Sequence, residues 1–342
     1  MSHDVPAPDS RNASRALDRA RDATVLVVGD AMLDRYVTGR VDRISPEAPV
    51  PVVRVEEDRD AAGGAANVAV GVAALGAGCR LVAAVGRDRD AERLAGMLED
   101  TGVDPADLVE DPDRPTTVKS RVLARHQQML RVDRESDEPL AEEARERLLD
   151  RALAALEEGA DVVALVDYDK GVLAGGTARR IVEAAREREV PTVVDPKLRG
   201  FFDYGGAHVF KPNGPELAAA LGREGPPRTE EELREVRRRL GCRYLLLTLG
   251  EEGMVLVGEP GDGTSRIPSE AREVFDVSGA GDTVTAVLSA ALAGGDGVPH
   301  AAALANFAAG LEVSHLGAVP VPREELLGAL EDDGSGRDAD RG

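Results

Sequence analysis

Residues 276–283 read DVSGAGDT, directly before an apolar and alanine-rich segment at 284–292. The strand-like Glu273, Val274 and Phe275 precede this octapeptide, so the order predicts a strand, a tight glycine turn and the start of a helix. A strand that feeds a helix through a short turn is the unit from which α/β folds are built.

The glycines of this turn suit an anion. Gly279 and Gly281 let the backbone take conformations closed to other residues, and they leave N–H groups unobstructed at the positive end of a helix. Asp282 lies within reach of such an anion, and the helix dipole favours its ionised form, so it is available as a base at neutral pH. This arrangement suggests phosphoryl transfer. An ordinary glycine turn followed by a helix-start aspartate explains the octapeptide equally well.

Size and charge narrow the class of protein. The 342 residues can bury a substantial core, and the formal charge of −21 repels nucleic acid and anionic membrane surfaces. Cys79 and Cys242 lie in apolar surroundings and fit reduced core thiols. No apolar run reaches membrane-spanning length, and the N-terminus lacks a signal-peptide pattern. We therefore expect cytoplasmic small-molecule chemistry, without nucleic-acid or membrane partners.

Short β-branched runs alternate with amphipathic helical patterns along most of the chain, which predicts βαβ units and a buried, mostly parallel sheet. Ligands of such sheets bind beyond the carboxyl ends of the strands. The predicted strands are 24–28, 81–85, 162–166, 192–194 and 244–249, and the predicted helices are 65–75, 90–100, 178–189 and 230–240.

Two segments interrupt this alternation. Residues 36–57 and 115–135 mix polar and apolar side chains without an intervening helix, and they predict a small accessory sheet. We favour a lid over the site to a pair of surface hairpins, because the segments flank a glycine pair at 63–64. Residues 1–22 are expected to be a flexible tail that ends in a short charged helix-like stretch, 23–331 one domain, and 332–342 a disordered acidic tail.

Two early motifs suit a polyol. GDAMLDR at 29–35 places Asp34 on a loop after the first strand, where a carboxylate accepts hydrogen bonds from sugar hydroxyls, although a turn aspartate is as plausible. AAGGAANVAVGVAALG at 61–76 combines Gly63 and Gly64, which allow close backbone approach, with the amide of Asn67. Close packing by small residues explains part of this run. It does not match the GxGxxG dinucleotide pattern.

Later motifs each follow a predicted strand: DYDKG at 167–171, DPK at 195–197, KPNGPE at 211–216 and TLGEEG at 248–253. Asn213 and Glu216 are three apart, so they share a helix face suited to ordering Mg²⁺-bound water near phosphates, or they form a helix cap. Thr248 begins a segment that forms either one wall of a nucleotide-binding site or a hairpin turn. The chain has no P-loop, HRD, DFG, GxSxG, HExxH or CxxC motif, which leaves the glycine-turn aspartate as the strong catalytic candidate.

Taken in order, these runs resemble the PfkB, or ribokinase-like, family of carbohydrate kinases, from about residue 25 to 330. The family's two signature regions match 61–76 and 276–283. Within the family, the sequence looks most like the D-glycero-β-D-manno-heptose-7-phosphate kinase domain of ADP-heptose synthesis enzymes. That closer likeness lies in GDAMLDRYVTGRVDRISPEAPVPVV at 29–53, HQQMLRVDRE at 126–135, DYDKGVL at 167–173 and VVDPKLRGFFDYGGA at 193–207.

The resemblance implies a three-layer α/β/α fold with a mostly parallel central sheet and a small β lid. It implies that Asp282 is the base and that the backbone of Gly279, Ala280 and Gly281 forms the anion hole. The other roles that it implies are sugar binding by Asp34, Gly63, Gly64 and Asn67, sugar-phosphate binding by Arg131, Asp133 and Lys197, Mg²⁺ and phosphate contacts by Asn213 and Glu216, a nucleotide site at Thr248, Gly250 and Gly253, and a monovalent cation, K⁺, at Asp276 and Ser278.

The resemblance thus implies an ATP- and Mg²⁺-dependent kinase that phosphorylates the anomeric hydroxyl of a heptose 7-phosphate. The alternatives are a kinase of the same fold for another sugar, sugar phosphate or nucleoside, and a catalytically silent sugar-binding regulator. The chain lacks the HxGH-type motif of the fused nucleotidyltransferase domain, so a separate enzyme is expected to act downstream. The family also implies a homodimer formed through the lid.

Overall fold

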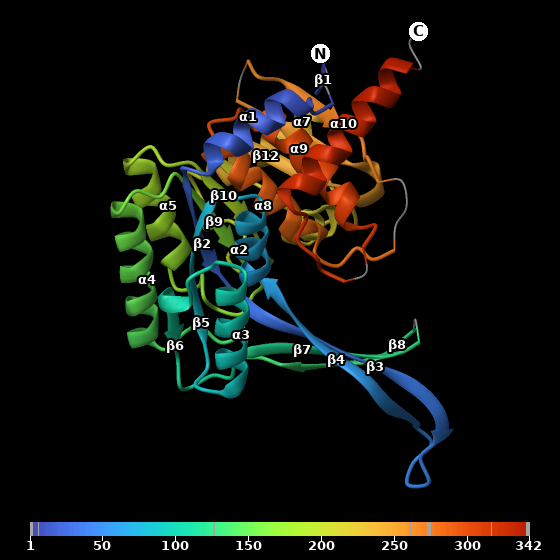
Figure 1. Cartoon of the computed structure of the whole chain (residues 1–342). Coiled ribbons are helices and arrows are strands. Elements are labelled where there is room, and N and C mark those ends of the chain that lie inside the picture. Colours follow the sequence, from blue (N-terminus) through green and yellow to red (C-terminus); the bar gives the residue numbers. More distant parts are fainter. Residues whose placement is uncertain are drawn as a thin grey trace.

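The computed structural model describes residues 3–5, 7–125, 127–259, 261–271, 275–315 and 317–339. A ten-stranded sheet crosses the body of the molecule in the order β1-β14-β13-β12-β11-β10-β9-β2-β5-β6 (Figure 1). Among the described strands, β13 alone runs antiparallel to its neighbours, so the predicted mostly parallel sheet is confirmed. The strands are β1 (His3–Asp4), β2 (Thr24–Gly29), β5 (Gly78–Val85), β6 (Leu108–Glu110), β9 (Val162–Val166), β10 (Thr192–Asp195), β11 (Val209–Phe210), β12 (Tyr244–Thr248), β13 (Met254–Val257) and β14 (Thr264–Ile267).

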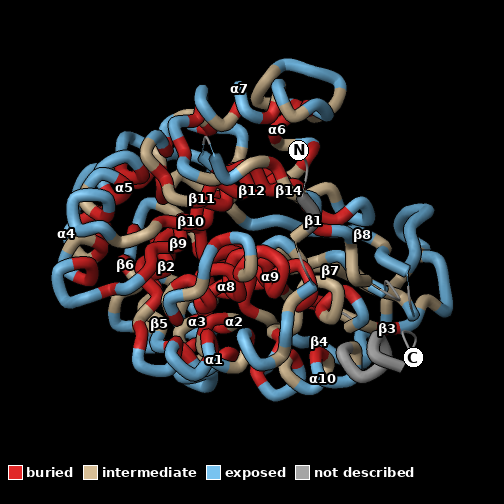
Figure 2. The backbone as a smooth tube through the Cα atoms, turned by 90° about the horizontal axis from the view of Figure 1, so that it is seen from above, coloured by how far each residue is buried: buried red, intermediate tan, exposed pale blue. Residues whose placement is uncertain are grey.

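Helices cover both faces of this sheet. Alternate residues of β2 point to opposite faces, so Val25 and Val27 enter one apolar core while Leu26 and Val28 enter the other. The first core packs against α1 (Ser10–Ala20), α2 (Ala65–Ala74), α3 (Arg89–Asp100), α8 (Ala280–Ala293), α9 (Val298–Glu312) and α10 (Arg323–Ala339), and the second against α4 (Glu142–Glu157), α5 (Thr177–Glu187), α6 (Gly214–Ala220) and α7 (Glu230–Leu240). Figure 2 shows buried backbone concentrated in the central strands and in α8 and α9. Two short 3₁₀ turns, η1 (Pro105–Asp107) and η2 (Gly250–Glu252), complete the elements.

A second sheet, the accessory sheet, has the order β4-β3-β7-β8 and projects from the body (Figure 1). Its strands are β3 (Ala31–Ile44), β4 (Pro51–Gly64), β7 (Thr117–Ala124) and β8 (Gln127–Arg134). Arg35 anchors it to α3 by ion pairs with Asp60 at 2.8 Å and Asp90 at 3.0 Å. The predicted accessory sheet is confirmed. Strand β3 begins at Ala31, before the expected start at residue 36, so Asp34 lies within β3 and not on a loop.

Both chain ends contain more helix than the sequence predicted. The segment expected to be a flexible tail contains α1, which buries Ala13, Ala16, Leu17 and Ala20. These four positions follow the i, i+3, i+4, i+7 spacing of a helical apolar stripe, so α1 packs on the core and is not a flexible tail. At the other end, α10 continues to Ala339, through most of the stretch predicted to be disordered.

Within the described residues, no helix is both long enough and apolar enough to cross a membrane.

Candidate active site

The carboxyl edge of the parallel strands collects the polar motifs, as the fold rule predicts. Asp30 follows β2, Asp167 follows β9, Asp195 ends β10, Lys211 follows β11 and Thr248 ends β12. Because these neighbouring strands run parallel, their last residues meet at one edge of the sheet. The N-terminal turns of α2 and α8 bring two further side chains to this edge.

Asp282 lies in the first turn of α8 and is only 4% exposed. Its Oδ2 accepts a hydrogen bond from Asn67 Nδ2 at 2.9 Å, and its Oδ1 accepts one from the Tyr168 hydroxyl at 2.7 Å. Burial raises the pKa of Asp282 to about 6, although both hydrogen bonds favour its charge. Burial is therefore the largest influence on its pKa, an effect that the sequence analysis did not include. The carboxylate is nevertheless mostly ionised at neutral pH.

The turn before Asp282 requires glycine at one of its two predicted positions. Gly279 caps α8 with φ +97°, and a Cβ there would lie 2.8 Å from Ala318 Cβ and 2.9 Å from Glu312 Oε1. Gly281 is an ordinary helical residue, so the expectation of an unusual conformation was wrong there. Phe275 does not continue a strand, and Glu273 and Val274 lie outside the described residues.

Lysine ammonium groups lie near Asp282, although the chain is strongly acidic and has only four lysines. Lys211 is buried and pairs with Asp195 Oδ2 at 2.9 Å, and that oxygen also accepts a hydrogen bond from Thr285 at 3.1 Å. Lys211 Nζ is also the atom nearest to where a Cβ on Gly281 would stand, at 3.8 Å. The start of α8 therefore combines free backbone N–H groups with a fixed cation, which suits a phosphoryl group.

The predicted sugar-binding residues lie on this same side. Asp34 forms an ion pair with Arg121 of β7. A Cβ on Gly63 would collide with Asp34 Oδ2, and one on Gly64 would collide with the backbone oxygen of Asp30. The glycine pair is therefore required by close packing, and Asn67 projects from the first turn of α2 as predicted.

Arg131 and Asp133 lie on β8 and pair with each other at 2.9 Å. The strand register places them opposite Arg121 and Lys119 of β7. They therefore belong to the accessory sheet next to residues that face the site, and the structure shows no hydrogen bond from either of them to Asp282.

The predicted nucleotide residues already have local structural roles. Asn213 caps α6 by accepting from Glu216 N at 2.8 Å, and Glu216 Oε2 accepts from Asn213 N at 2.8 Å. This reciprocal arrangement confirms the helix-cap interpretation. The other carboxylate oxygen of Glu216 pairs with Lys197. Thr248 ends β12, and η2 then returns the chain to the antiparallel β13, which confirms a hairpin.

Gly250 and Gly253 flank this hairpin turn, with φ +59° and +82°. A Cβ on Gly253 would collide with the backbone of Ile267 and lie 2.6 Å from Ser269 N. Both glycines are therefore explained by the turn, whatever else they contact.

Asp276 folds the loop before the helix back on itself. Its Oδ1 accepts from Ser278 N at 2.9 Å, and its Oδ2 accepts from Gly317 N at 3.1 Å. The buried Glu312 faces the same turn, and burial together with the charges of Asp276 and Asp282 raises its pKa to about 8. Within the described residues neither Glu312 oxygen makes a hydrogen bond of normal geometry, although the backbone N–H of Val319 favours its charge.

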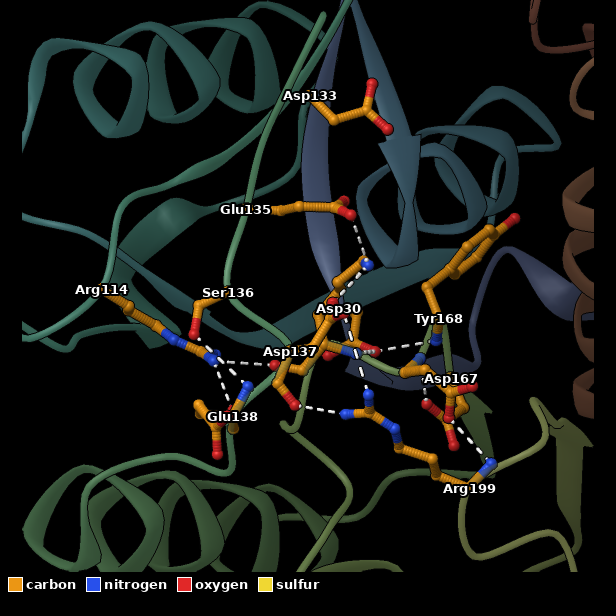
Figure 3. A network of polar contacts seen from close by, with 12 residues as sticks. Asp30, Arg114, Asp133, Glu135, Ser136, Asp137, Glu138, Asp167, Tyr168 and Arg199 are labelled. Carbon is orange, nitrogen blue, oxygen red and sulfur yellow. Dashed lines mark hydrogen bonds and ion pairs between the residues drawn. The ribbon is translucent and has the colours of Figure 1, made fainter.

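The backbone of the DYDKG loop is hydrogen-bonded to the carboxylate of a buried aspartate, Asp30 (Figure 3). Asp30 accepts hydrogen bonds from the backbone N–H groups of Tyr168 at 2.7 Å, Lys170 at 3.0 Å and Val172 at 3.2 Å. Figure 3 shows the Tyr168 ring projecting away from this network. The loop backbone is thus fixed while one aromatic side chain extends toward Asp282.

A second buried aspartate, Asp167, lies next to Asp30 in this network. Asp167 accepts from the Tyr204 hydroxyl at 2.6 Å, and burial, followed by the charge of Asp30, raises the pKa of Asp167 to about 7. Lys170 ties the loop to the segment after β8 through Glu135 at 2.8 Å and Asp137 at 2.6 Å.

The sequence analysis missed Tyr168, Arg121 and Lys119. Lys119 lies 5.4 Å from the centre of the Tyr168 ring, and Lys197 lies 5.0 Å from it. The scarcity of lysine was a usable signal, because each of the four lysines lies in this region of the structure. No spacing in the sequence connects Tyr168 or Arg121 to the aspartates that they contact.

Comparisons with known proteins agree with this geometry. A family model described as pfkB family carbohydrate kinase matches residues 22–324. The bifunctional protein HldE of Rhodospirillum rubrum is 43% identical over 98% of this chain and 67% of its own length. The HldE protein of Pseudomonas paraeruginosa is 46% identical over 92% of this chain and 65% of its own. The chain thus spans about two thirds of the length of these relatives.

Solved structures share the fold. Ribokinase of Arabidopsis thaliana, solved with ribose and ATP, has a TM-score of 0.68 at 23% identity and covers 90% of this chain and 98% of its own. Phosphofructokinase-2 of Escherichia coli, solved in complex with potassium, has a TM-score of 0.73 at 18% identity, with coverage of 90% and 99%. At these identities the likeness shows the ribokinase-like fold alone. With the family model and the relatives, it shows that this chain belongs to the pfkB family of carbohydrate kinases, phosphotransferases whose acceptor is a sugar hydroxyl.

Proposed function

We propose that this chain transfers the γ-phosphoryl group of ATP to the anomeric hydroxyl of a heptose 7-phosphate, with Asp282 as the base. The observation that carries the proposal is the buried Asp282 carboxylate at the start of α8, beside the glycine turn and Lys211. The sequence likeness to HldE proteins supports the heptose phosphate as acceptor.

The chemistry follows from these groups. The acceptor hydroxyl donates to an Asp282 oxygen, and its proton passes to that carboxylate as the new bond to phosphorus forms. The bond between the γ-phosphorus and the bridging oxygen breaks, and ADP leaves with that electron pair. The backbone N–H groups of Gly279, Ala280 and Gly281, with Lys211, stabilise the charge on the transferred group.

Mg²⁺ is the expected counter-ion of ATP, and Glu216 fits it through water only. Both Glu216 oxygens already accept one hydrogen bond, from Lys197 and from Asn213 N, and each keeps a lone pair that a metal-bound water can use. Among the described residues no hydrogen bond uses the side-chain NH₂ of Asn213, which could donate to a phosphate. Thr248, Gly250 and Gly253 lie on the adjacent hairpin and would form the nucleotide side of the site.

A monovalent cation, K⁺, fits the loop of Asp276 and Ser278. The loop carries a carboxylate, and the Glu312 carboxylate is buried beside it without a normal hydrogen bond among the described residues. A cation here would favour the ionised form of Glu312 and would offset its charge and that of Asp276 beside the Gly279 turn.

We infer that the acceptor binds among the predicted sugar-binding residues. Asp34, Gly63, Gly64 and Asn67 would bind its hydroxyls. Its phosphate would meet Lys197, Lys119 and Arg131 of β8, and Asp133 would hold the Arg131 guanidinium with which it pairs. Within the described residues Lys119 forms no ion pair, although Asp34 and Glu135 lie near it.

The accessory sheet has two proposed roles, as a lid and as a dimer contact. Large apolar side chains are exposed on it: Ile44, Val55, Leu130 and Val132 are each about half exposed. A second copy of the chain would cover them, and closure would exclude water from ATP. A separate nucleotidyltransferase would use the product.

Steady-state kinetics with an acceptor panel test the proposal. The panel contains heptose 7-phosphate, the unphosphorylated heptose, hexose 6-phosphates, ribose and adenosine. We expect kcat/KM to be highest for heptose 7-phosphate and at least tenfold lower without its phosphate, since the phosphate would pair with Lys119 and Lys197, two partly buried cations beside the Tyr168 ring. A preference for an unphosphorylated hexose or a nucleoside would contradict the heptose assignment. Calorimetric binding without product formation would instead indicate a silent regulator.

A further inference from the structure

We propose that Tyr168 is the positioning residue of the Asp282 base: its hydroxyl holds one carboxylate oxygen while Asn67 holds the other. The inference rests on the proposed role of Asp282 and adds a residue to it. The Tyr168 hydroxyl lies 2.7 Å from Asp282 Oδ1, and the Asn67 amide lies 2.9 Å from Oδ2. With one donor on each oxygen, the carboxylate cannot rotate without breaking a hydrogen bond.

Tyr168 is itself held at several points. Its backbone N–H donates to the buried Asp30 at 2.7 Å. A Cβ on Gly64 would lie 3.4 Å from its ring, so the glycine leaves room for the aromatic side chain. The ammonium groups of Lys119 and Lys197 lie 5.4 and 5.0 Å from the ring centre, within the range of cation–π attraction. A residue anchored in this way presents its hydroxyl to Asp282 before any substrate arrives.

The hydroxyl acts on Asp282 as a donor and not as a second base. Burial and the neighbouring charge of Asp282 raise the pKa of the Tyr168 hydroxyl well above its ordinary value, so it keeps its proton. Its hydrogen bond favours the ionised carboxylate and leaves a lone pair of Oδ1 for the acceptor hydroxyl.

Other charges also act on Asp282. Asp195 disfavours its ionisation and Lys211 favours it. Asp282 in turn raises the pKa of Glu312 and that of Lys197, which places both of these groups within electrostatic range. Tyr168 and Asn67 are thus neutral donors among charges of both signs. Removal of the Tyr168 hydroxyl leaves the charges in place and tests the hydrogen bond alone.

The test is a pH titration of the full-length protein by NMR, with aspartate labelled at ¹³Cγ, for wild type, Tyr168→Phe and Tyr204→Phe. Asp282→Asn identifies the Asp282 resonance. We expect Tyr168→Phe to raise the pKa of Asp282 by about one unit, because a donor to the charged form is lost. Tyr204→Phe is the matched control, because it removes a hydroxyl that donates to Asp167 instead, and it should leave Asp282 unchanged. An unchanged Asp282 pKa in Tyr168→Phe would overturn the proposal.

A second readout needs no substitution at Tyr168. The chain has four tyrosines, so ¹³Cζ-tyrosine labelling gives few resonances. The Tyr168 resonance should shift with the titration of Asp282 near pH 6, and Asp282→Asn should abolish that shift. A Tyr168 chemical shift that does not change with the titration of Asp282 would also overturn the proposal. Neither NMR experiment uses a sugar, so an incorrect acceptor assignment would leave this test intact.

Kinetics then connect the contact to turnover, with ATP and the best acceptor of the panel. A one-unit rise in the Asp282 pKa lowers the ionised fraction about fivefold at pH 6 and little at pH 8. We therefore expect the acid limb of kcat/KM to move to higher pH in Tyr168→Phe, with the KM for ATP unchanged. A uniform loss at every pH, with an unmoved acid limb, would indicate a packing role only.

Discussion

Two buried aspartates of this protein each accept a tyrosine hydroxyl, but their surroundings differ. Asp282 lies at the start of a helix, with Lys211 and the glycine turn beside it. Asp167 lies behind the DYDKG loop next to Asp30, another buried carboxylate. Burial raises the pKa of both, to about 6 and about 7. A raised pKa therefore does not identify a catalytic base; cations and an anion-binding turn distinguish the two.

The largest expected effect comes from removing the cation beside Asp282. Lys211→Met leaves Asp195 buried without its ion-pair partner, and we expect the free energy of unfolding to fall by about 3–5 kcal/mol. Phosphoryl transfer should also be lost. Chemical denaturation and steady-state kinetics measure the two effects.

The double variant Lys211→Met with Asp195→Asn separates them. It removes both buried charges, so stability should largely return while turnover stays low. Recovery of turnover together with stability would show that Lys211 only supports the fold.

The pH dependence of wild-type kcat/KM sharpens the comparison. Asp282 must be ionised to accept a proton, so activity should be full above its pKa and fall about tenfold per pH unit below pH 6. This fall in kcat/KM at low pH, the acid limb of the profile, should be absent from the residual activity of Asp282→Asn and present in Asp167→Asn. A limb near pH 4 would indicate a carboxylate with an unperturbed pKa.

Asp167 should affect the pH dependence of the free energy of unfolding and not the turnover rate. Its pKa is raised above the unfolded value, so the folded state keeps a proton that the unfolded state loses between about pH 4 and 7. Its contribution is therefore most favourable below pH 4 and is lost as pH rises to about 7, by about 1.4 kcal/mol per pH unit. Denaturation of wild type and Asp167→Asn at several pH values measures this slope, which the variant should lack. Equal slopes would contradict the assignment.

The smallest effect is expected at Lys170, which joins the loop to Glu135 and Asp137 at a partly exposed site. Lys170→Met should lower the free energy of unfolding by at most about 1 kcal/mol, and less in high salt. Turnover should stay within about twofold. A large loss of kcat would contradict this and would show that Lys170 takes part in the active site and does not only fix the loop.

The sequence predicted the mostly parallel sheet, about half of the described helices, the accessory sheet and the position of Asp282 at a helix start, because hydrophobic period and glycine turns are local signals. It did not predict the contact of Tyr168 with Asp282, which joins residues 114 positions apart. For Asn213 and Glu216 it left a ligand role and a helix cap open, and the structure shows the cap. Local patterns specify elements, while long-range packing decides which polar groups meet.

The most direct test is a rapid-quench single turnover of ATP with heptose 7-phosphate at pH 8, for wild type, Asp282→Asn and Asp167→Asn. Calorimetry first shows that each variant binds both substrates. We predict that Asp282→Asn slows phosphoryl transfer on the order of 10² to 10⁴-fold and that Asp167→Asn stays within about tenfold of wild type. Near-normal transfer in Asp282→Asn, or equal losses in the two variants, would contradict the assignment of Asp282 as the base.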